Sequence, residues 1–281
     1  MTDFGGALRS FKDHPEADLV VVGIPFDAKS SYLRGAAGGP AAIRAISTGR
    51  CYNPETELGA NLARDGVLVD YGDVELPEDP QTAFEAMRRA VRSVLAKGAK
   101  PIVLGGDHSI TYPVVQAFGE KFRPLDILHF DAHPDLYDSL DGDRLSHACP
   151  FRRVVEEGFV GRLVQVGLRA ATEAQRDFAR EHGVEWIEMK DFGEGPRLAF
   201  SHPLYISFDL DCLDPAFAPG VSHHEPGGLT VRQALSVLQN LEGRIVGLDV
   251  VELNPARDPA NLTAAAAFKI IKEVAGRMPR P

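Results

Sequence analysis

Acidic and imidazole side chains recur at short spacing in four separate segments of the chain. The segments are Gly105–Ser109 (GGDHS), Asp131–Asp135 (DAHPD), Asp209–Pro215 (DLDCLDP) and Val251–Pro255 (VELNP). Ionised carboxylates are rarely buried unless they are paired or bound to metal, so a cluster of them needs a cation. If the fold brings the four segments together, they therefore predict a metal site.

Two imidazoles and four carboxylates form the candidate ligand set, which is His108, Asp131, His133, Asp135, Asp209 and Asp211. Oxygen-rich ligation with some nitrogen and no well-placed thiolate suits Mn²⁺, with Fe²⁺, Co²⁺ and Zn²⁺ as alternatives. Six ligands are too many for one catalytic ion that must keep a water. They suit a pair of ions about 3.5–4 Å apart, bridged by a carboxylate and a water, which generates hydroxide at neutral pH.

Each of the four segments follows a short apolar run, and such runs predict the strands of a sheet. The predicted strands are Asp18–Pro25, Val67–Gly72, Pro101–Gly105, Leu125–Asp131, Leu163–Leu168, Leu204–Asp209, Arg244–Val250 and, more weakly, Val184–Ile187. Several of them are apolar almost throughout, which is typical of parallel strands covered on both faces. Ligands of such sheets bind beyond the carboxyl ends of the strands, where the four segments begin.

Helical periodicity between these runs completes a β-α-β alternation. Apolar residues recur at helical spacing in Gln81–Lys97, and Val231–Leu241 and Asn261–Met278 have similar patterns. The region Tyr32–Arg64 is the least regular, with a Gly/Pro-rich stretch that opens a helix near Ala41. The alternation predicts one α/β domain over residues 1–281, a three-layer α-β-α arrangement around a mainly parallel eight-stranded sheet.

Composition narrows the classes of partner. Forty acids against thirty Lys and Arg residues give a formal charge of −10, which argues against nucleic acid or an anionic membrane as a partner. The excess is compatible with a cationic ligand or metal ions, and solubility is the simpler explanation for charge alone.

Cys51, Cys149 and Cys212 form no CxxC motif and cannot all pair, so a disulfide framework is not expected. With no long apolar run and no leader pattern, we expect a cytoplasmic protein.

Five motifs carry a resemblance to a known family. GGDHS, DAHPD, SFDLDCLDP, PGVSHHEPGGL and GLDVVELNP are similar, in their sequence order, to the signature set of the arginase/agmatinase (ureohydrolase) family. The similarity extends from about Val21 to the final helix and is closest to the plant-type branch, as in DILHFDAHPDLYD, LSHA and DCLDPAFAPGVSH. It implies an arginase-like fold and a homo-trimer or homo-hexamer.

The resemblance also implies how the candidate ligands divide between two Mn²⁺ ions. One ion would be held by His108, Asp131, Asp135 and Asp209, and the other by Asp131, His133, Asp209 and Asp211. Asp131 and Asp209 would bridge the two. Strand geometry agrees, because Asp131, His133 and Asp135 share parity, as do Asp209 and Asp211. In the family, a bridging hydroxide attacks the guanidinium carbon and the tetrahedral intermediate collapses to urea and an amine.

Two further residues take catalytic roles in this interpretation. Glu252 is expected to meet the guanidinium of a small cationic substrate through paired charge-assisted hydrogen bonds. His147 stands at the family's position for a proton shuttle, and an unperturbed imidazole pKa of ~6.5 suits protonation of the leaving amine.

The segment Leu136–Arg153 is expected to line the outer end of the pocket, where the substrate's tail would lie. Candidate contacts there are Ser146, Asp143, Arg153 and Arg144, with Arg169 from another loop. Asp143 stands where plant-type relatives have an amide, and Cys149 and Pro150 replace small hydroxyl residues. An added acid makes a poorer carboxylate pocket, so the sequence favours agmatine as substrate, with L-arginine as the alternative and guanidinobutyrate open.

Simpler structural roles compete at several positions. Asp107 is expected to cap the helix near Ile110, and Asp214 to stabilise a turn. His129 lies inside an apolar strand, where a core or supporting histidine is expected, whereas His223 or His224 could contact substrate. Two other functions remain as rivals, a dinuclear metallophosphoesterase and a catalytically silent family member.

Overall fold

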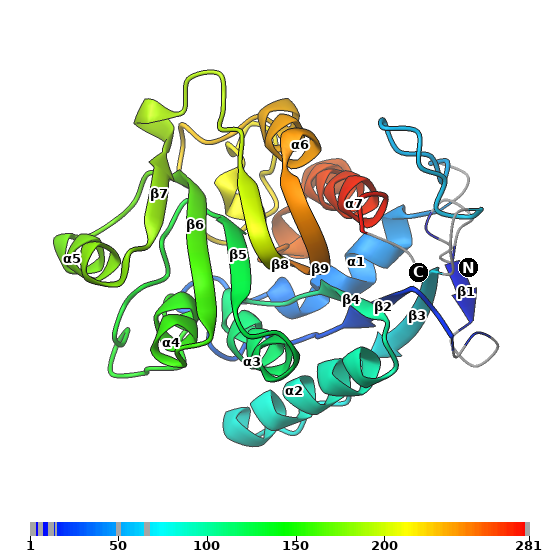
Figure 1. Cartoon of the computed structure of the whole chain (residues 1–281), viewed down its shortest axis with the longest axis horizontal. Helices are drawn as coiled ribbons and strands as arrows, with labels where there is room; N and C mark the ends of the chain where they lie inside the picture. Colours follow the sequence, from blue (N-terminus) through cyan, green and yellow to red (C-terminus); the bar gives the residue numbers. More distant parts are fainter. Residues whose placement is uncertain are drawn as a thin grey trace.

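A parallel sheet forms the centre of the molecule. The computed structural model describes residues 4, 8–10, 14, 16–48, 52–64 and 68–278. Nine strands pair in the order β1-β3-β2-β4-β9-β8-β5-β6-β7, and all of these pairings are parallel (Figure 1). The strands are β1 (Leu8–Ser10), β2 (Leu19–Gly23), β3 (Leu68–Asp73), β4 (Lys100–Leu104), β5 (Leu125–Phe130), β6 (Val160–Leu168), β7 (Glu185–Glu188), β8 (Ala199–Asp209) and β9 (Glu242–Val251).

The predicted fold class is confirmed. Each of the eight apolar runs contains a strand, although Val67, the first residue of one run, lies outside the described residues. The sheet has one strand more than predicted, because the three-residue β1 pairs with β3 at the edge. A segment that short carries no periodicity from which a strand could be predicted.

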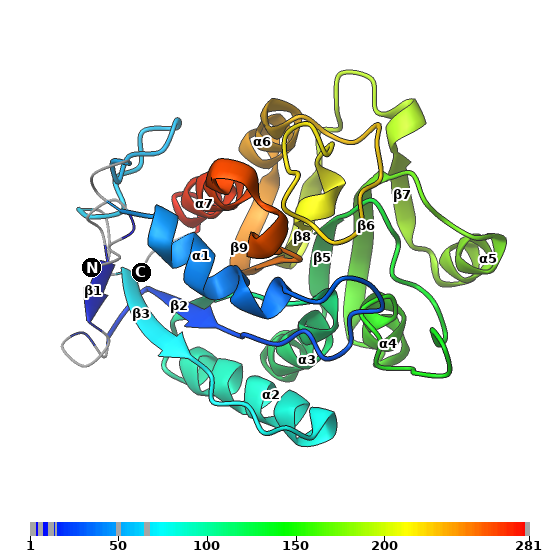
Figure 2. The ribbon, with the colours of Figure 1, turned by 180° about the vertical axis from the view of Figure 1, so that it is seen from behind.

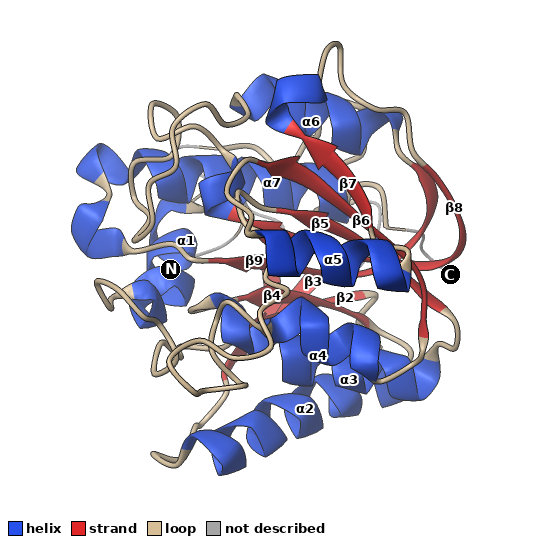
Figure 3. Ribbon diagram, turned by 90° about the vertical axis from the view of Figure 1, so that its left-hand side faces the viewer, coloured by secondary structure: helices blue, strands red, loops and turns tan. Residues whose placement is uncertain are grey.

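Helices cover both faces of the sheet, as the side view in Figure 3 shows. They are α1 (Gly39–Ile46), α2 (Pro80–Ala96), α3 (Thr111–Lys121), α4 (Pro150–Glu156), α5 (Glu173–His182), α6 (Val231–Asn240) and α7 (Leu262–Ala275). One hydrophobic core joins one face of the sheet to α1, α6 and α7, and a second joins the other face to α2–α5. Figure 2 shows α1 and α7 side by side over the same face. Burial on both faces explains why several of the strand sequences are apolar almost throughout.

The four strands that precede the acidic segments are neighbours in the order β4-β9-β8-β5. Their carboxyl ends are level, since Leu104 pairs with Val250, Phe208 with Phe130, and Asp209 with Val251. Segments more than a hundred residues apart in the chain therefore leave the sheet side by side.

Local interactions fix the loop after β4. The carboxylate of Asp107 accepts a hydrogen bond from the Ser109 N–H and caps the 3₁₀ turn His108–Ile110, which confirms its predicted capping role. Gly106 lies against the backbone of Phe26, and a Cβ at this position would come within 1.7 Å of the Phe26 carbonyl oxygen. A glycine is required here because only hydrogen fits in that space.

Two sequence-based expectations outside the sheet can also be compared with the structure. Cys149 and Cys212 are buried and unpaired, as expected, whereas Cys51 lies outside the described residues. Within the described ranges, no helix has both the length and the apolar character needed to cross a bilayer.

Candidate metal centre

Three carboxylates converge on one imidazole nitrogen at the carboxyl ends of β4, β5 and β8. His108 Nδ1 lies 3.1 Å from an Oδ2 atom of each of Asp131, Asp135 and Asp209. All four side chains are buried, and His108 is only 1% exposed. Buried carboxylates around a nitrogen lone pair repel one another, and a divalent cation at their centre would remove that repulsion.

The hydrogen bonds of His108 leave Nδ1 available as a ligand. Its Nε2 lies 3.0 Å from Ser207 Oγ, and Ser207 donates its own hydroxyl proton to Asp249 Oδ1 at 2.6 Å. Ser207 Oγ must then accept from Nε2–H, so the neutral ring has no proton on Nδ1. Nδ1 is a buried atom without a hydrogen-bond partner, as expected of an atom that binds a metal.

A second group of ligand atoms adjoins the first through Asp131. His133 Nδ1 lies 3.1 Å from Asp211 Oδ2 and 3.3 Å from Asp131 Oδ1, the oxygen that does not face His108. Ligand atoms of Asp131, His133 and Asp211 all lie within 4.8 Å of one another. Asp131 thus presents one oxygen to each group, the arrangement of a bridging carboxylate. The cluster is consistent with a binuclear metal site.

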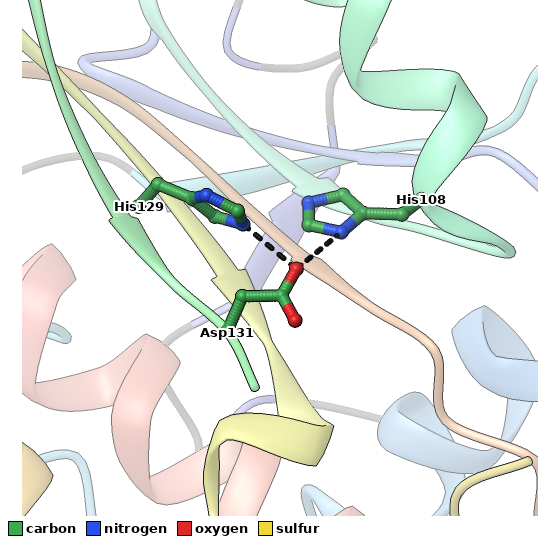
Figure 4. A group of neighbouring side chains, drawn as sticks. All are labelled: His108, His129 and Asp131. Atoms are coloured by element: carbon green, nitrogen blue, oxygen red, sulfur yellow. Dashed lines mark hydrogen bonds and ion pairs between the residues drawn. The ribbon is translucent and has the colours of Figure 1, made fainter. Parts of the chain in front are cut away.

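His129 supports Asp131 from inside β5. Figure 4 shows His108 and His129 on the two sides of the Asp131 carboxylate. Gln165 Nε2 donates to His129 Nδ1 at 2.8 Å, so His129 Nε2 carries the proton that it shares with Asp131 Oδ2, also at 2.8 Å. Both ring nitrogens are engaged, which favours the supporting role expected of His129.

Without metal, the cluster distorts the protonation of its own members. Burial, together with Asp211 and Asp131, raises the pKa of Asp209 well above its usual value, and burial with the charge of Asp131 raises that of Asp135 to about 6. Burial opposes protonation of His133, but Asp211 and Asp131 outweigh it and raise its pKa to about 12. Protons therefore take the place of a cation in the metal-free protein.

Two site residues have strained backbone. Asp135 has a φ of 51° and Glu252 a φ of 67°, in the left-handed region that side chains with a Cβ rarely adopt. Such strain concentrates at functional positions and is held there by the surrounding structure. Hydrogen bonds hold Glu252 in this conformation, because its N–H donates to Gly106 O at 2.8 Å and its Oε1 accepts from the His108 N–H at 2.8 Å.

His147 lies beside Glu252 at the wall of the site. His147 Nδ1 is 3.4 Å from Glu252 Oε1, and His147 Nε2 is 2.8 Å from Ser31 Oγ. Burial opposes the charged imidazole, but Glu252 outweighs it and raises the pKa of His147 to about 9. The same pairing lowers the pKa of Glu252 although burial alone would raise it. The two groups form an ion pair at neutral pH.

A cavity of about 390 Å³ opens above these groups. Its walls are formed by Ser31, His133, Asp135, Tyr137, Leu140, His147, Ala148, Ala170, Ala171, Thr172, Gln175, Asp209, Asp211, His223 and Glu252. The cavity reaches both groups of candidate ligands and both predicted catalytic residues, so a small substrate would meet all of them.

None of the five side chains predicted as outer contacts lines this cavity. Ser146 and Asp143 line a smaller adjoining cavity of about 160 Å³, where Asp143 Oδ2 lies 2.6 Å from Lys29 Nζ. The Arg153 guanidinium binds Asp138 and Glu156 instead, and no contact of Arg153 with the main cavity is found among the described residues. This arrangement gives no support to a direct contact of Arg153 with substrate.

The other two arginines are also engaged elsewhere. Arg144 binds Asp138 and Glu156 at the surface. Arg169 donates to backbone carbonyls, including Glu225 O at 2.8 Å and Asp211 O at 2.7 Å, and so holds two loops together. The Asp214 carboxylate accepts hydrogen bonds from the N–H groups of Ala216 and Gly227, which confirms the turn expected there.

Several cavity residues were not anticipated from the sequence. Ser31 and the wall formed by Ala170–Thr172 lie in loops whose local sequence gives no chemical signal, whereas Tyr137 belongs to the segment Leu136–Arg153 that was expected to line the pocket. The capping box of α5, in which Thr172 and Gln175 exchange hydrogen bonds, is a recognisable signal and would have placed this helix end. His223, expected as one of two candidates, lines the cavity and stacks on His147 with ring centroids 5.1 Å apart.

The geometry defines a class of protein, one with a candidate binuclear metal site at the carboxyl ends of parallel strands. Comparison with known proteins gives the family. A sequence model described as the Arginase family matches residues 17–276. The chain therefore belongs to the arginase family, and it is a ureohydrolase that acts on C–N bonds of linear amidines.

Individual relatives show the same similarity. "Arginase 1, mitochondrial" of Arabidopsis thaliana is 43% identical over 279 residues, covering 94% of this chain and 82% of the relative. An agmatinase of Chromobacterium violaceum is 38% identical, covering 92% of this chain and 83% of its own. The solved structure of an arginase from Medicago truncatula superimposes with a TM-score of 0.86 at 42% identity, covering 94% of this chain and 88% of that one.

Proposed function

We propose that this ureohydrolase hydrolyses L-arginine to L-ornithine and urea with two Mn²⁺ ions. The observation that carries the reaction is the pair of ligand groups joined through Asp131, beneath a cavity that also contains Glu252 and His147. The sequence favoured agmatine. The comparisons support the alternative, L-arginine, better, because the plant arginases are more similar to the chain than the agmatinase is.

The residues present fit the two ions. His108, Asp131, Asp135 and Asp209 would hold one, and Asp131, His133, Asp209 and Asp211 the other. When bound, such ions activate water for attack at neutral pH by lowering its pKa. The orphaned Nδ1 of His108 and the shared carboxylate of Asp131 support this assignment.

Glu252 binds and orients the guanidinium. Its carboxylate is buried yet ionised, because His147 and the His108 N–H lower its pKa against the effect of burial. A buried carboxylate at a cavity wall forms strong charge-assisted hydrogen bonds with a planar cation. Binding in this orientation directs the guanidinium carbon toward the ligand cluster.

His147 supplies a proton to the leaving amine. With its pKa raised to about 9 by Glu252, the imidazole is protonated at neutral pH and can act as a general acid. It lines the cavity beside the position proposed for the guanidinium. Collapse of the tetrahedral intermediate then releases urea and a neutral amine.

The outer wall of the cavity favours binding of a substrate that carries a carboxylate. Thr172, the N-cap of α5, lines the cavity together with Ala170 and Ala171. The amino end of a helix carries partial positive charge, which favours the α-carboxylate of L-arginine. Agmatine is the second candidate, because neither lysine nor arginine is found among the described residues that line the main cavity.

A substrate panel tests the proposal. The Mn²⁺-loaded protein is assayed for urea with L-arginine, agmatine and guanidinobutyrate, and kcat/KM is compared. We expect the highest value with L-arginine. A higher kcat/KM with agmatine would favour agmatine as the substrate, as the sequence predicts. Release of phosphate from a generic phosphoester, with no urea from any guanidine, would favour a metallophosphoesterase.

Three broader properties belong to the same proposal. We propose a single domain over residues 1–281, a homo-trimer or homo-hexamer, and a cytoplasmic location, although several plant relatives carry the word mitochondrial in their names. Light scattering on purified protein would give the mass of the oligomer. Imaging of a tagged chain would give its location.

A further inference from the structure

The loop between β2 and α1 reaches across the sheet to the proposed proton donor. Ser31, in this loop, is exposed and lines the main cavity. Its Oγ lies 2.8 Å from His147 Nε2, although the two residues are 116 positions apart in the chain. We propose that Ser31 is a positioning residue that holds the His147 ring in its working orientation. This inference rests on the proton-donor role proposed above for His147.

The two ring nitrogens of His147 have different partners. Nδ1 faces the Glu252 carboxylate at 3.4 Å, and a carboxylate can only accept, so Nδ1 carries a proton. Nε2 faces the Ser31 hydroxyl, which can both donate and accept. The hydroxyl donates to Nε2 when the ring is neutral and accepts from Nε2–H when the ring is charged. Ser31 therefore keeps the ring in one orientation in both protonation states.

The loop that carries Ser31 is itself anchored to the site. The Lys29 N–H donates to Asp107 Oδ2 at 2.9 Å, and the His147 N–H donates to Lys29 O at 3.4 Å. Lys29 Nζ pairs with Asp143 Oδ2 at 2.6 Å, which joins the loop to the segment that precedes His147. Both the backbone and the side chain of His147 thus contact the same loop.

Stacking alone does not fix the ring. His223 stacks on His147 with an interplanar angle of 30°, which restrains the plane of the ring but is compatible with a 180° rotation of the ring about its Cβ–Cγ bond. Glu252 restrains one nitrogen. The hydrogen bond with Ser31 is the second point of attachment needed to prevent that rotation, and a misplaced proton donor slows the reaction without weakening substrate binding.

Substitution of Ser31 tests the inference. For Ser31→Ala we expect kcat for urea release to fall about 10-fold, the loss typical of one hydrogen bond to a charged group, with KM changed less than about 2-fold. Ser31→Thr keeps the hydroxyl and should recover most of kcat. Ser93→Ala, on the outer face of α2, is the matched control, since this exposed hydroxyl donates to the Ala90 O of its own helix.

The pH profile adds a readout that a purely structural role would not move. Glu252, Asp135, Asp107 and His223 are the titratable groups that act on His147. They are unchanged in Ser31→Ala. Both forms of the ring lose a hydrogen bond with Oγ, but the bond from the charged ring is the stronger, so the charged form loses more. The basic limb of the kcat profile should therefore move to lower pH, by about half a unit or more.

The outcomes separate this inference from the proposed function. Urea release by the wild type with kcat of Ser31→Ala within about 2-fold, or an unmoved basic limb, would overturn the positioning role while leaving the function intact. A wild-type protein that releases no urea from any guanidine would overturn the proposed function first. Circular dichroism and metal content of each variant confirm that the fold and the cluster are retained.

Discussion

The hydroxyl of Ser207 offers a direct test of how the fold prepares a metal ligand. Ser207 lies in β8 and connects His108 Nε2, at 3.0 Å, to Asp249 Oδ1, at 2.6 Å. The three side chains are 1% exposed or less, so solvent cannot replace a lost partner. Ser207→Ala leaves His108 Nε2–H without its acceptor, which allows the tautomer with a proton on Nδ1, a form that cannot bind metal.

The size of the effect follows from the burial. An unsatisfied buried donor costs about 1–3 kcal/mol. Loss of a supporting hydrogen bond to a metal ligand typically weakens metal binding about 10- to 100-fold, which corresponds to about 1.4–2.8 kcal/mol. Asp249 keeps the bonds that its Oδ2 accepts from Tyr205 and Thr111, whereas its Oδ1 loses the bond from Ser207. We therefore expect the Mn²⁺ dissociation constant to rise about 10- to 100-fold.

Calorimetric titration of chelated protein with Mn²⁺ at fixed pH measures this change. Thr263→Val is the matched control, because it removes an equally buried hydroxyl that accepts from the Gly220 N–H, far along the chain from the ligands. Its metal affinity should match the wild type. A Ser207→Ala dissociation constant within about 2-fold of the wild type would refute the claim that this hydrogen bond prepares His108.

Three other predictions concern the proton donor, the metal-free protein and the substrate. His147→Asn should lower kcat by about 10²- to 10⁴-fold and leave the metal content unchanged. Urea assays and elemental analysis of the same samples check this expectation. Loss of metal from the variant would contradict it. Folded-state pKa values are raised to about 6 for Asp107 and Asp135 and to about 12 for His133, so the folded metal-free protein binds more protons than the unfolded chain. The free energy of unfolding of the metal-free protein should therefore fall as pH rises, between about pH 4 and 6 because of the acids and above about pH 6.5 because of the imidazole. Added Mn²⁺ should restore this free energy most at high pH. Melting temperatures with and without metal test this, and a metal-free protein that becomes more stable as pH rises over that range would contradict it. Lys29→Ala removes the cationic partner of Asp143. The value of kcat/KM for L-arginine, divided by that for agmatine, should then fall by up to about 5-fold. An unchanged ratio would show that this ion pair does not act on the substrate's tail.

The sheet was predictable because its strands are buried on both faces. A strand covered by helices on two sides must be apolar along its length, and β2, β4 and β5 have this signature, whereas β3 and β7 near the sheet edges are more polar. The shortest and most polar elements were missed. β1 has three residues, and α5 has a polar outer face whose amphipathic pattern is visible only once its capping box is recognised.

The candidate ligands were predictable because each follows a strand, and parallel strands end at one edge. The supporting groups were not. Asp249 lies within the apolar run of β9, and its partners Thr111, Tyr205 and Ser207 come from other elements. Nothing local in the sequence shows that these groups meet.

The outer contacts depended on side-chain direction, which sequence does not give. Arg153 lies in the expected segment, but its guanidinium binds Asp138 and Glu156. Ser31 lies in a loop without regular structure, and only the folded chain brings it to His147.

The central claim is that the buried carboxylate and imidazole cluster holds two metal ions that enable urea release. The most direct test is to add Mn²⁺ stepwise to chelated protein and to measure bound metal and urea from L-arginine in the same samples. We predict that urea release is absent without metal and rises to its maximum as two ions bind per chain. Full urea release from verified metal-free protein, or no release at saturation, would contradict the account.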